Sequence, residues 1–122
     1  MIVLDASALL AYVFGEPGAD VVAGVLDEAV ISTVNEAEVL TRLVRDGRDP
    51  AAVVLPIHEV VPFDSNQARA AAALTPATRP LGLSLADRAC LALALTRHWP
   101  VLTADRVWAT LTLGIEVRLI RP

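Results

Sequence analysis

Lysine is absent from this 122-residue chain, and cysteine occurs once, at Cys90. A single cysteine excludes an internal disulfide and a metal cage built from several thiolates. No uncharged apolar run approaches the roughly 18 residues of a membrane span. The N-terminus has no basic segment ahead of its apolar stretch, which argues against a signal peptide. We therefore expect a cytoplasmic protein that does not associate with membranes.

The net negative charge of the chain does not by itself decide whether it binds nucleic acid. The net charge of −4 and the pI of about 5.0 argue against nucleic acid as a partner, because nucleic-acid binders usually carry a basic patch. All ten basic residues are arginines, however, and arginine binds phosphate through a planar fork. Acids that belong to a metal site would in addition be neutralised by bound cations.

Strand and helix signals alternate along the chain, and an apolar fraction of 55% argues against disorder. This alternation favours a mostly parallel sheet with helices on both faces. We expect one domain spanning residues 1–122, of the α/β class. The predicted strands are residues 2–4, 29–32, 60–63, 101–104 and 116–120, and the predicted helices are 8–14, 19–28, 34–46, 50–58, 65–74, 84–98 and 106–111.

Several details of these elements can also be predicted. Ser7 is a candidate N-cap of the first helix, and residues 75–80, TPATRP, are expected to form a loop. In the segment that ends at Gly47, apolar residues recur with a helical period, which predicts a helix. These residues are Val34, Ala37, Leu40 and Val44. Pro62 suggests that the third strand is short or lies near an edge of the sheet.

Four acids fall at one predicted edge of the sheet. Asp5 and Asp105 follow strands, whereas Glu38 and Asp87 lie in the first turns of helices. In parallel α/β sheets, ligands bind beyond the carboxyl ends of the strands. Each acid also has a simpler interpretation. Asp5 and Asp105 are candidate helix caps, Asp87 fits a capping box with Ser84, and Glu38 fits a solvated helix face.

Repulsion between like charges means that a cluster of four carboxylates needs a specific physical explanation. Two carboxylates about 5 Å apart repel by about 3 kcal/mol at an effective dielectric constant near 20. A cluster of four therefore needs cations or raised pKa values. Carboxylates without nearby histidine or thiolate ligands suit Mg²⁺ and Mn²⁺, which prefer oxygen ligands, and do not suit structural zinc.

Four segments taken together resemble a known family. IVLDASALL, ISTVNEAEVL, GLSLADRACLALAL and VLTADRVW are similar, in this order, to motifs of the PIN domain and within it of the VapC-type toxin ribonucleases. The resemblance extends from Ile2 to the final strand. It implies a three-layer α/β/α sandwich and an endoribonuclease that depends on Mg²⁺ or Mn²⁺. It also implies a homodimer and a cognate antitoxin whose peptide tail covers the active site.

Residue by residue, the resemblance assigns the catalytic acids to Asp5, Glu38, Asp87 and Asp105, with the three aspartates as metal ligands. Ser7 and Thr103 fall at its hydroxyl positions, where they would orient water or a carboxylate; helix capping and strand packing are the alternatives. Glu36 makes the register of the helix acid ambiguous, and the Val-Leu pair that follows Glu38 favours Glu38.

Four arginines are candidate contacts to RNA phosphates. Arg42 and Arg45 lie one and two turns beyond Glu38, and Arg88 and Arg106 each follow an acid of the cluster. For each arginine, an exposed position without a substrate role is the alternative. The apolar surplus, with Trp108, further suggests a surface for a partner subunit.

Other functions fit less well. The chain has no G-x-S-x-G elbow and no glycine-rich phosphate loop. By resemblance, a phosphoacceptor receiver domain needs a lysine, and a haloacid-dehalogenase-type phosphatase needs an aspartate where Ser7 stands. Cys90 lies in an apolar helix face and is expected in the core. The remaining alternative is a non-catalytic scaffold that keeps the metal site and binds RNA or an antitoxin.

Overall fold

The computed structural model describes all residues, 1–122, and contains one parallel sheet of five strands in the order β3-β2-β1-β4-β5. Strand β3 lies at an edge, as Pro62 predicts. The strands are β1 (Ile2–Leu4), β2 (Ala29–Ser32), β3 (Glu59–Val61), β4 (Val101–Thr103) and β5 (Val117–Leu119).

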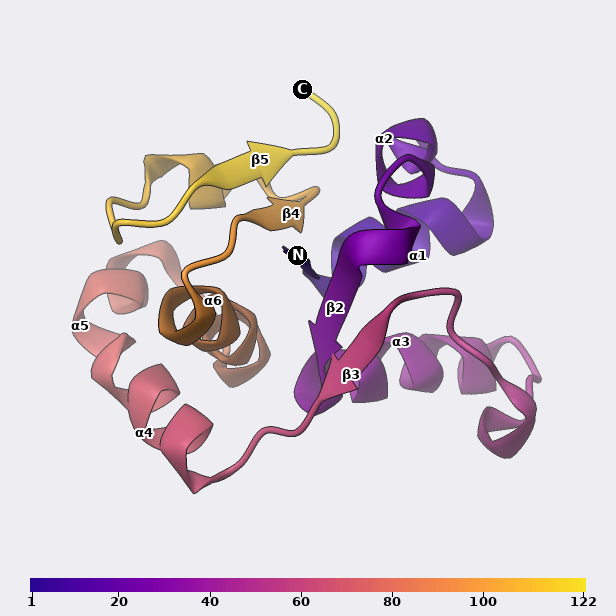
Figure 1. Cartoon of the computed structure of the whole chain (residues 1–122), viewed down its shortest axis with the longest axis horizontal. Coiled ribbons are helices and arrows are strands. Elements are labelled where there is room, and N and C mark those ends of the chain that lie inside the picture. The colour runs from indigo at the N-terminus through magenta and orange to yellow at the C-terminus, as the bar shows by residue number, and fades with distance from the viewer.

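Helices connect these strands and cover both faces of the sheet (Figure 1). The α-helices are α1 (Ala6–Phe14), α2 (Ala19–Ala23), α3 (Thr33–Arg45), α4 (Ser65–Ala73), α5 (Thr75–Thr78) and α6 (Leu85–Arg97). Short 3-10 helices are η1 (Leu26–Glu28), η2 (Pro50–Ala52), η3 (Arg79–Leu81) and η4 (Arg106–Thr110). The predicted α/β class and the parallel sheet flanked by helices are confirmed. None of the helices combines the length and apolar character that a membrane crossing requires.

The strands divide the core into two layers because their side chains alternate between the two faces of the sheet. Ile2 and Leu4 of β1 pack with α1, α2 and α3, whereas Val3 packs on the opposite face with α4 and α6. Cys90 lies in this second layer, as predicted, and burial raises the pKa of its thiol well above the usual value. Trp108 is also fully buried there, so it packs the core and forms no partner surface.

The order of the strands determines where the site forms. Strands β1 and β4 are neighbours, with Leu4 paired to Leu102 in register. Both strands run in the same direction, so their carboxyl ends meet at one edge. Asp5 and Asp105 follow these two ends, and α3 begins directly after the neighbouring strand β2.

Several local predictions are wrong. The helix expected over residues 19–28 ends at Ala23, where Gly24 follows, and the one expected over 50–58 is only the single turn η2. Val53, Val54 and Pro56 disfavour helix beyond that turn. Residues 75–81 form α5 and η3 instead of a loop. Pro76 and Pro80 each stand in the first turn of a helix, where proline is tolerated.

The helix predicted from residue 34 is present as α3, and tertiary packing decides which of its faces is buried. Asn35, Val39 and Leu43 are its buried residues, spaced four positions apart, whereas Val44 is 49% exposed. Both faces of this helix carry apolar residues, so periodicity alone does not decide which one packs. The sheet and α1 take the face with Val39 and Leu43, which join the first core layer.

Candidate active site

Asp5 is held at the carboxyl end of β1 by three hydrogen bonds. Its Oδ1 accepts from the backbone N–H of Ala6 at 2.9 Å, which caps α1. Its Oδ2 accepts from the hydroxyls of Ser7 at 2.7 Å and Thr103 at 2.9 Å. The sequence offered both Ser7 and Asp5 as candidate caps of this helix, and the N-cap of α1 is Asp5. Ser7 instead orients the carboxylate and accepts from the N–H of Ala104.

Burial makes this carboxylate unusual. Asp5 is only 6% exposed, and desolvation raises its pKa from 3.8 to about 6. The hydrogen bonds from Ser7 and Thr103 act in the opposite direction, and the nearby charges of Asp87 and Glu38 raise the pKa further. Groups with such perturbed pKa values concentrate at functional sites. Neither of the two salt bridges in the structure involves Asp5, so no basic side chain neutralises its charge.

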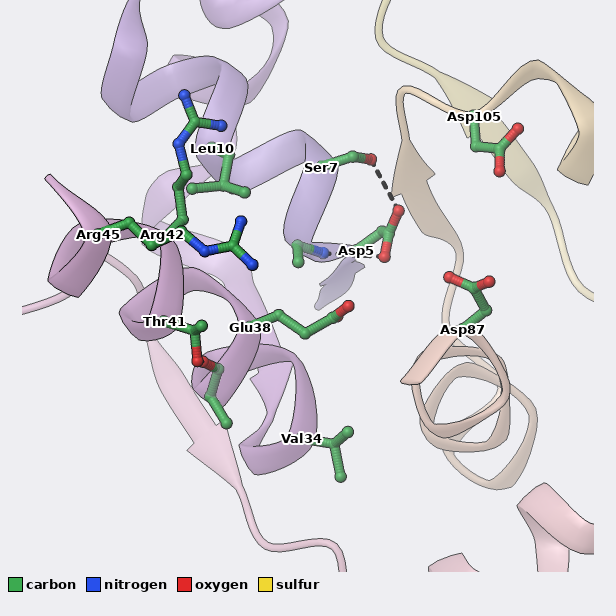
Figure 2. Close-up of a pocket in the computed structure, with 12 residues that line it drawn as sticks. Asp5, Ser7, Leu10, Val34, Glu38, Thr41, Arg42, Arg45, Asp87 and Asp105 are labelled. Carbon is green, nitrogen blue, oxygen red and sulfur yellow. Dashed lines mark hydrogen bonds between the residues drawn. The ribbon is translucent and has the colours of Figure 1, made fainter. Parts of the chain in front are cut away.

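The other three acids reach the same pocket from three different elements (Figure 2). Glu38 extends from α3, Asp87 from the first turn of α6, and Asp105 from the segment after β4. Asp87 forms the capping box with Ser84, and Asp105 caps η4 through the N–H of Val107. Both acids therefore cap a helix, as the alternative interpretation predicted, and both also line the pocket. In each, one carboxylate oxygen is engaged in the cap.

The pocket has a volume of about 600 Å³ and joins an acidic part to a basic part. Arg42 and Arg45 line it together with Glu38, because all three lie on one side of α3. The guanidinium of Arg42 also lies over the ring of Phe14, 4.6 Å from its centroid. The lining residues are Asp5, Ala6, Ser7, Leu10, Val34, Ala37, Glu38, Thr41, Arg42, Arg45, Asp87 and Asp105.

Three candidates lie outside this lining. Arg88 donates to the carbonyl of Ala71 and the hydroxyl of Thr75, so it ties α6 to α4 and α5 and points away from the pocket. Arg106 is exposed on η4. Thr103 is fully buried behind Asp5, where it links Oδ2 of Asp5 to the backbone N–H of Asp105. Arg88 therefore serves the packing of helices in this structure.

The donor set suits a hydrated divalent ion. Four carboxylates and no histidine or cysteine line the pocket, which is the chemistry that Mg²⁺ and Mn²⁺ prefer. No three His, Cys, Asp or Glu side chains are arranged so that they hold one ion directly. Mg²⁺ commonly keeps several waters and takes only one or two carboxylates, completing its shell with substrate phosphates. The residues present therefore fit such an ion without a cage made entirely of protein.

Asn35 is a further polar residue beside the pocket, and it is not among the site residues predicted from the sequence. It is completely buried, and its amide donates to Glu38 and to the backbone of α6. The signal that identifies it is its spacing. It lies four residues before Val39 and eight before Leu43, which places a polar side chain within the buried stripe of α3.

The parallel sheet flanked by helices and the acidic pocket at its carboxyl edge define an α/β protein with a candidate metal centre. The PIN domain matches residues 2–112, and the chain belongs to this family. No curated protein matches the sequence.

Solved structures share the fold over nearly their whole length. A chain of a toxin–antitoxin complex from Klebsiella pneumoniae has a TM-score of 0.75 at 17% identity, covering 94% of this chain and 95% of that one. VapBC2 from Rickettsia felis, bound to a DNA fragment from its promoter, has a TM-score of 0.73 at 13% identity, covering 98% of both chains. VapBC-5 from Mycobacterium tuberculosis is 26% identical, with a TM-score of 0.57 and coverage of 98% and 97%.

Proposed function

We propose that this chain is a divalent-metal-dependent endoribonuclease that hydrolyses phosphodiester bonds of RNA. The observation that carries the proposal is the shared pocket, in which four acids, two following β1 and β4 and two on α3 and α6, adjoin two arginines. Membership of the PIN domain family supports the same chemistry. A pocket of this kind combines carboxylates that can bind a divalent cation with guanidinium groups that can bind a phosphate.

In the proposed mechanism, Asp5, Asp87 and Asp105 would surround a hydrated Mg²⁺ or Mn²⁺ ion, with some carboxylates reaching it through water, and Glu38 would act as a further ligand or position water. Such an ion would supply positive charge for the scissile phosphate and would lower the pKa of a water that attacks it. Ser7 and Thr103 hold the Asp5 carboxylate in one orientation through their hydroxyls. The capping bonds of Asp87 and Asp105 fix one oxygen of each and leave the other free.

Arg42 and Arg45 bind the RNA backbone in this proposal. They lie one and two turns beyond Glu38, so a strand whose scissile phosphate sits among the acids presents its flanking phosphates to them. Phosphate contacts position a nucleic acid and carry no sequence information by themselves. The arginines therefore account for binding of RNA as a class.

We further propose that the chain is the toxin component of a toxin–antitoxin pair and forms a homodimer. Structures with the same fold come from toxin–antitoxin complexes of several bacteria. Exposed apolar side chains offer contact area for a partner. Val13 and Phe14 at the end of α1 are each 37% exposed, and Leu85 at the start of α6 is 55% exposed.

A non-catalytic scaffold that binds RNA or an antitoxin is the second candidate. It is favoured by the helix caps that Asp5, Asp87 and Asp105 make, because these caps give each aspartate a structural role. The test that separates the two candidates is cleavage of RNA by purified, antitoxin-free protein with Mg²⁺ or Mn²⁺ present. A chain that leaves every RNA intact under these conditions is the scaffold.

A further inference from the structure

A polar side chain interrupts the buried stripe of α3 beside the pocket. Asn35 is 0% exposed, and it shares this stripe with Val39 and Leu43 at spacings of four residues. An apolar residue of similar size at this position would extend the core layer below α3. The amide is therefore placed where packing alone favours a hydrocarbon side chain.

The orientation of this amide follows from its two partners. Nδ2 donates to Oε1 of Glu38 at 2.9 Å and to the backbone carbonyl of Ala86 at 3.0 Å. Both partners are acceptors, so the NH₂ group must face them, and the flipped amide would place Oδ1 against two oxygens. Asn35 therefore connects α3 to the first turn of α6, directly before Asp87.

This orientation leaves Oδ1 of Asn35 buried without a donor. An unpaired buried acceptor destabilises a fold, and in native structures each such group calls for a specific explanation. The explanation that the contacts offer is that the NH₂ group serves the pocket. It bonds one acid of the pocket and the residue that precedes another.

We propose that Asn35 is a positioning residue that restrains the Glu38 carboxylate and fixes its place relative to Asp87. Glu38 is itself exposed on α3, and a long acidic side chain on a helix surface normally samples several rotamers. The bond from Asn35 selects among them, and the bond to Ala86 keeps α6 at a set distance from α3. This inference rests on the proposed nuclease function and adds to it a residue that touches neither substrate nor ion.

The chain contains a matched control for the loss of a buried amide. Gln67 of α4 is 7% exposed, donates to Thr96 of α6 at 2.7 Å and also leaves its oxygen without a donor. It lies outside the pocket that holds the acids. Gln67→Leu and Asn35→Leu thus remove the same kind of buried tie to α6, one remote from the acids and one beside them.

The first test is steady-state cleavage of a single-stranded RNA by the full chain with Mn²⁺, together with thermal melting of every variant. We expect Asn35→Leu to lower kcat by about tenfold or more with little change in KM. The reason is that the hydrogen bond from Asn35 to Glu38 orients a group needed for the chemical step and does not contact the RNA. Gln67→Leu is expected to keep kcat within about twofold of the wild type even where it lowers the melting temperature. In a Glu38→Ala background, Asn35→Leu should cause a much smaller further loss.

The second test does not depend on activity or on a stable variant. In the wild-type chain, ¹³C relaxation of the Glu38 side chain is compared with that of Glu36, which lies outside this contact on the same helix. We expect Glu38 to be the more ordered of the two. Equal rotamer averaging of Glu38 and Glu36 would overturn the inference, as would unchanged kcat in a folded Asn35→Leu. A wild-type chain with an ordered Glu38 but no cleavage of RNA would instead refute the nuclease function.

Discussion

Thr103 donates a hydrogen bond of 2.9 Å to Oδ2 of Asp5, although 98 positions of chain separate the two residues. The same hydroxyl accepts from the backbone N–H of Asp105 at 3.0 Å. One side chain thus joins the carboxylate at the end of β1 to the backbone of the acid at the end of β4. The parallel pairing of β1 with β4 makes this connection possible, because it brings both strand ends to one edge.

The raised pKa of Asp5 predicts a pH-dependent effect of Asp5→Asn on stability. The folded state has a pKa of about 6 and the unfolded chain about 3.8, so the folded state binds more protons between these values. The contribution of Asp5 to the stability of the metal-free wild type therefore falls as the pH rises from about 4 to about 6, by about 3 kcal/mol in total. Asp5→Asn lacks this loss and should be the more stable protein at pH 7.

Denaturant unfolding at pH 4 to 8 with a chelator measures the difference. We expect the advantage of Asp5→Asn to be near zero at the acid end and to grow towards neutral pH. Asp27→Asn, which removes an exposed carboxylate outside the pocket, reports the effect of such a substitution alone. A difference between Asp5→Asn and wild type that does not vary with pH would contradict the account of Asp5.

The basic part of the pocket predicts how RNA binding depends on salt. Arg42→Ala and Arg45→Ala should each weaken binding of single-stranded RNA to a catalytically impaired background such as Asp5→Asn. Each should also reduce the slope of log K against log salt by about 0.7, the value for one lost phosphate contact on a single strand. Arg69→Ala removes an exposed positive charge on α4, outside the pocket, and should leave the slope unchanged. Equal slopes for all three variants across a salt series would exclude Arg42 and Arg45 as phosphate contacts.

The capping box of α6 predicts that two neighbouring substitutions separate stability from activity. Ser84→Ala removes the side-chain acceptor for the N–H of Asp87 and should cost about 1 kcal/mol of stability. Asp87→Asn keeps an oxygen that can accept from the N–H of Ser84 but removes the charge from the pocket. Calorimetry and cleavage assays should show a lower melting temperature with activity largely kept for Ser84→Ala, and lost cleavage for Asp87→Asn. Comparable losses of cleavage in both would mean that Asp87 acts through the cap.

The convergence of Asp5 and Asp105 could be predicted from the sequence because it follows from the class of fold. Each acid lies within two residues of the end of an apolar strand, and parallel strands end at a common edge. The placement of Arg42 and Arg45 beside Glu38 was equally predictable, since spacings of four and seven residues share one side of any helix. These predictions use only local periodicity and the direction of the strands.

What could not be predicted depends on tertiary packing. Helix α3 carries apolar residues on more than one face, and only its packing against the sheet, α1 and α6 decides that Asn35 is buried while Val44 is exposed. The direction of Arg88 is similar, because its partners Ala71 and Thr75 belong to α4 and α5, which sequence spacing does not relate to α6. The role of Asn35 depends on the carbonyl of Ala86 in the same way.

The central claim is that acids from four separate segments form one metal-dependent hydrolytic site, and nuclease activity of purified, antitoxin-free protein tests it most directly. Wild type and Asp5→Asn are assayed side by side on single-stranded RNA with Mg²⁺, with Mn²⁺ and with a chelator. We predict cleavage by the wild type with either ion, none with the chelator, and a loss of about 100-fold or more for Asp5→Asn. Cleavage by the wild type that persists in chelator, or that Asp5→Asn retains in full, would contradict the account.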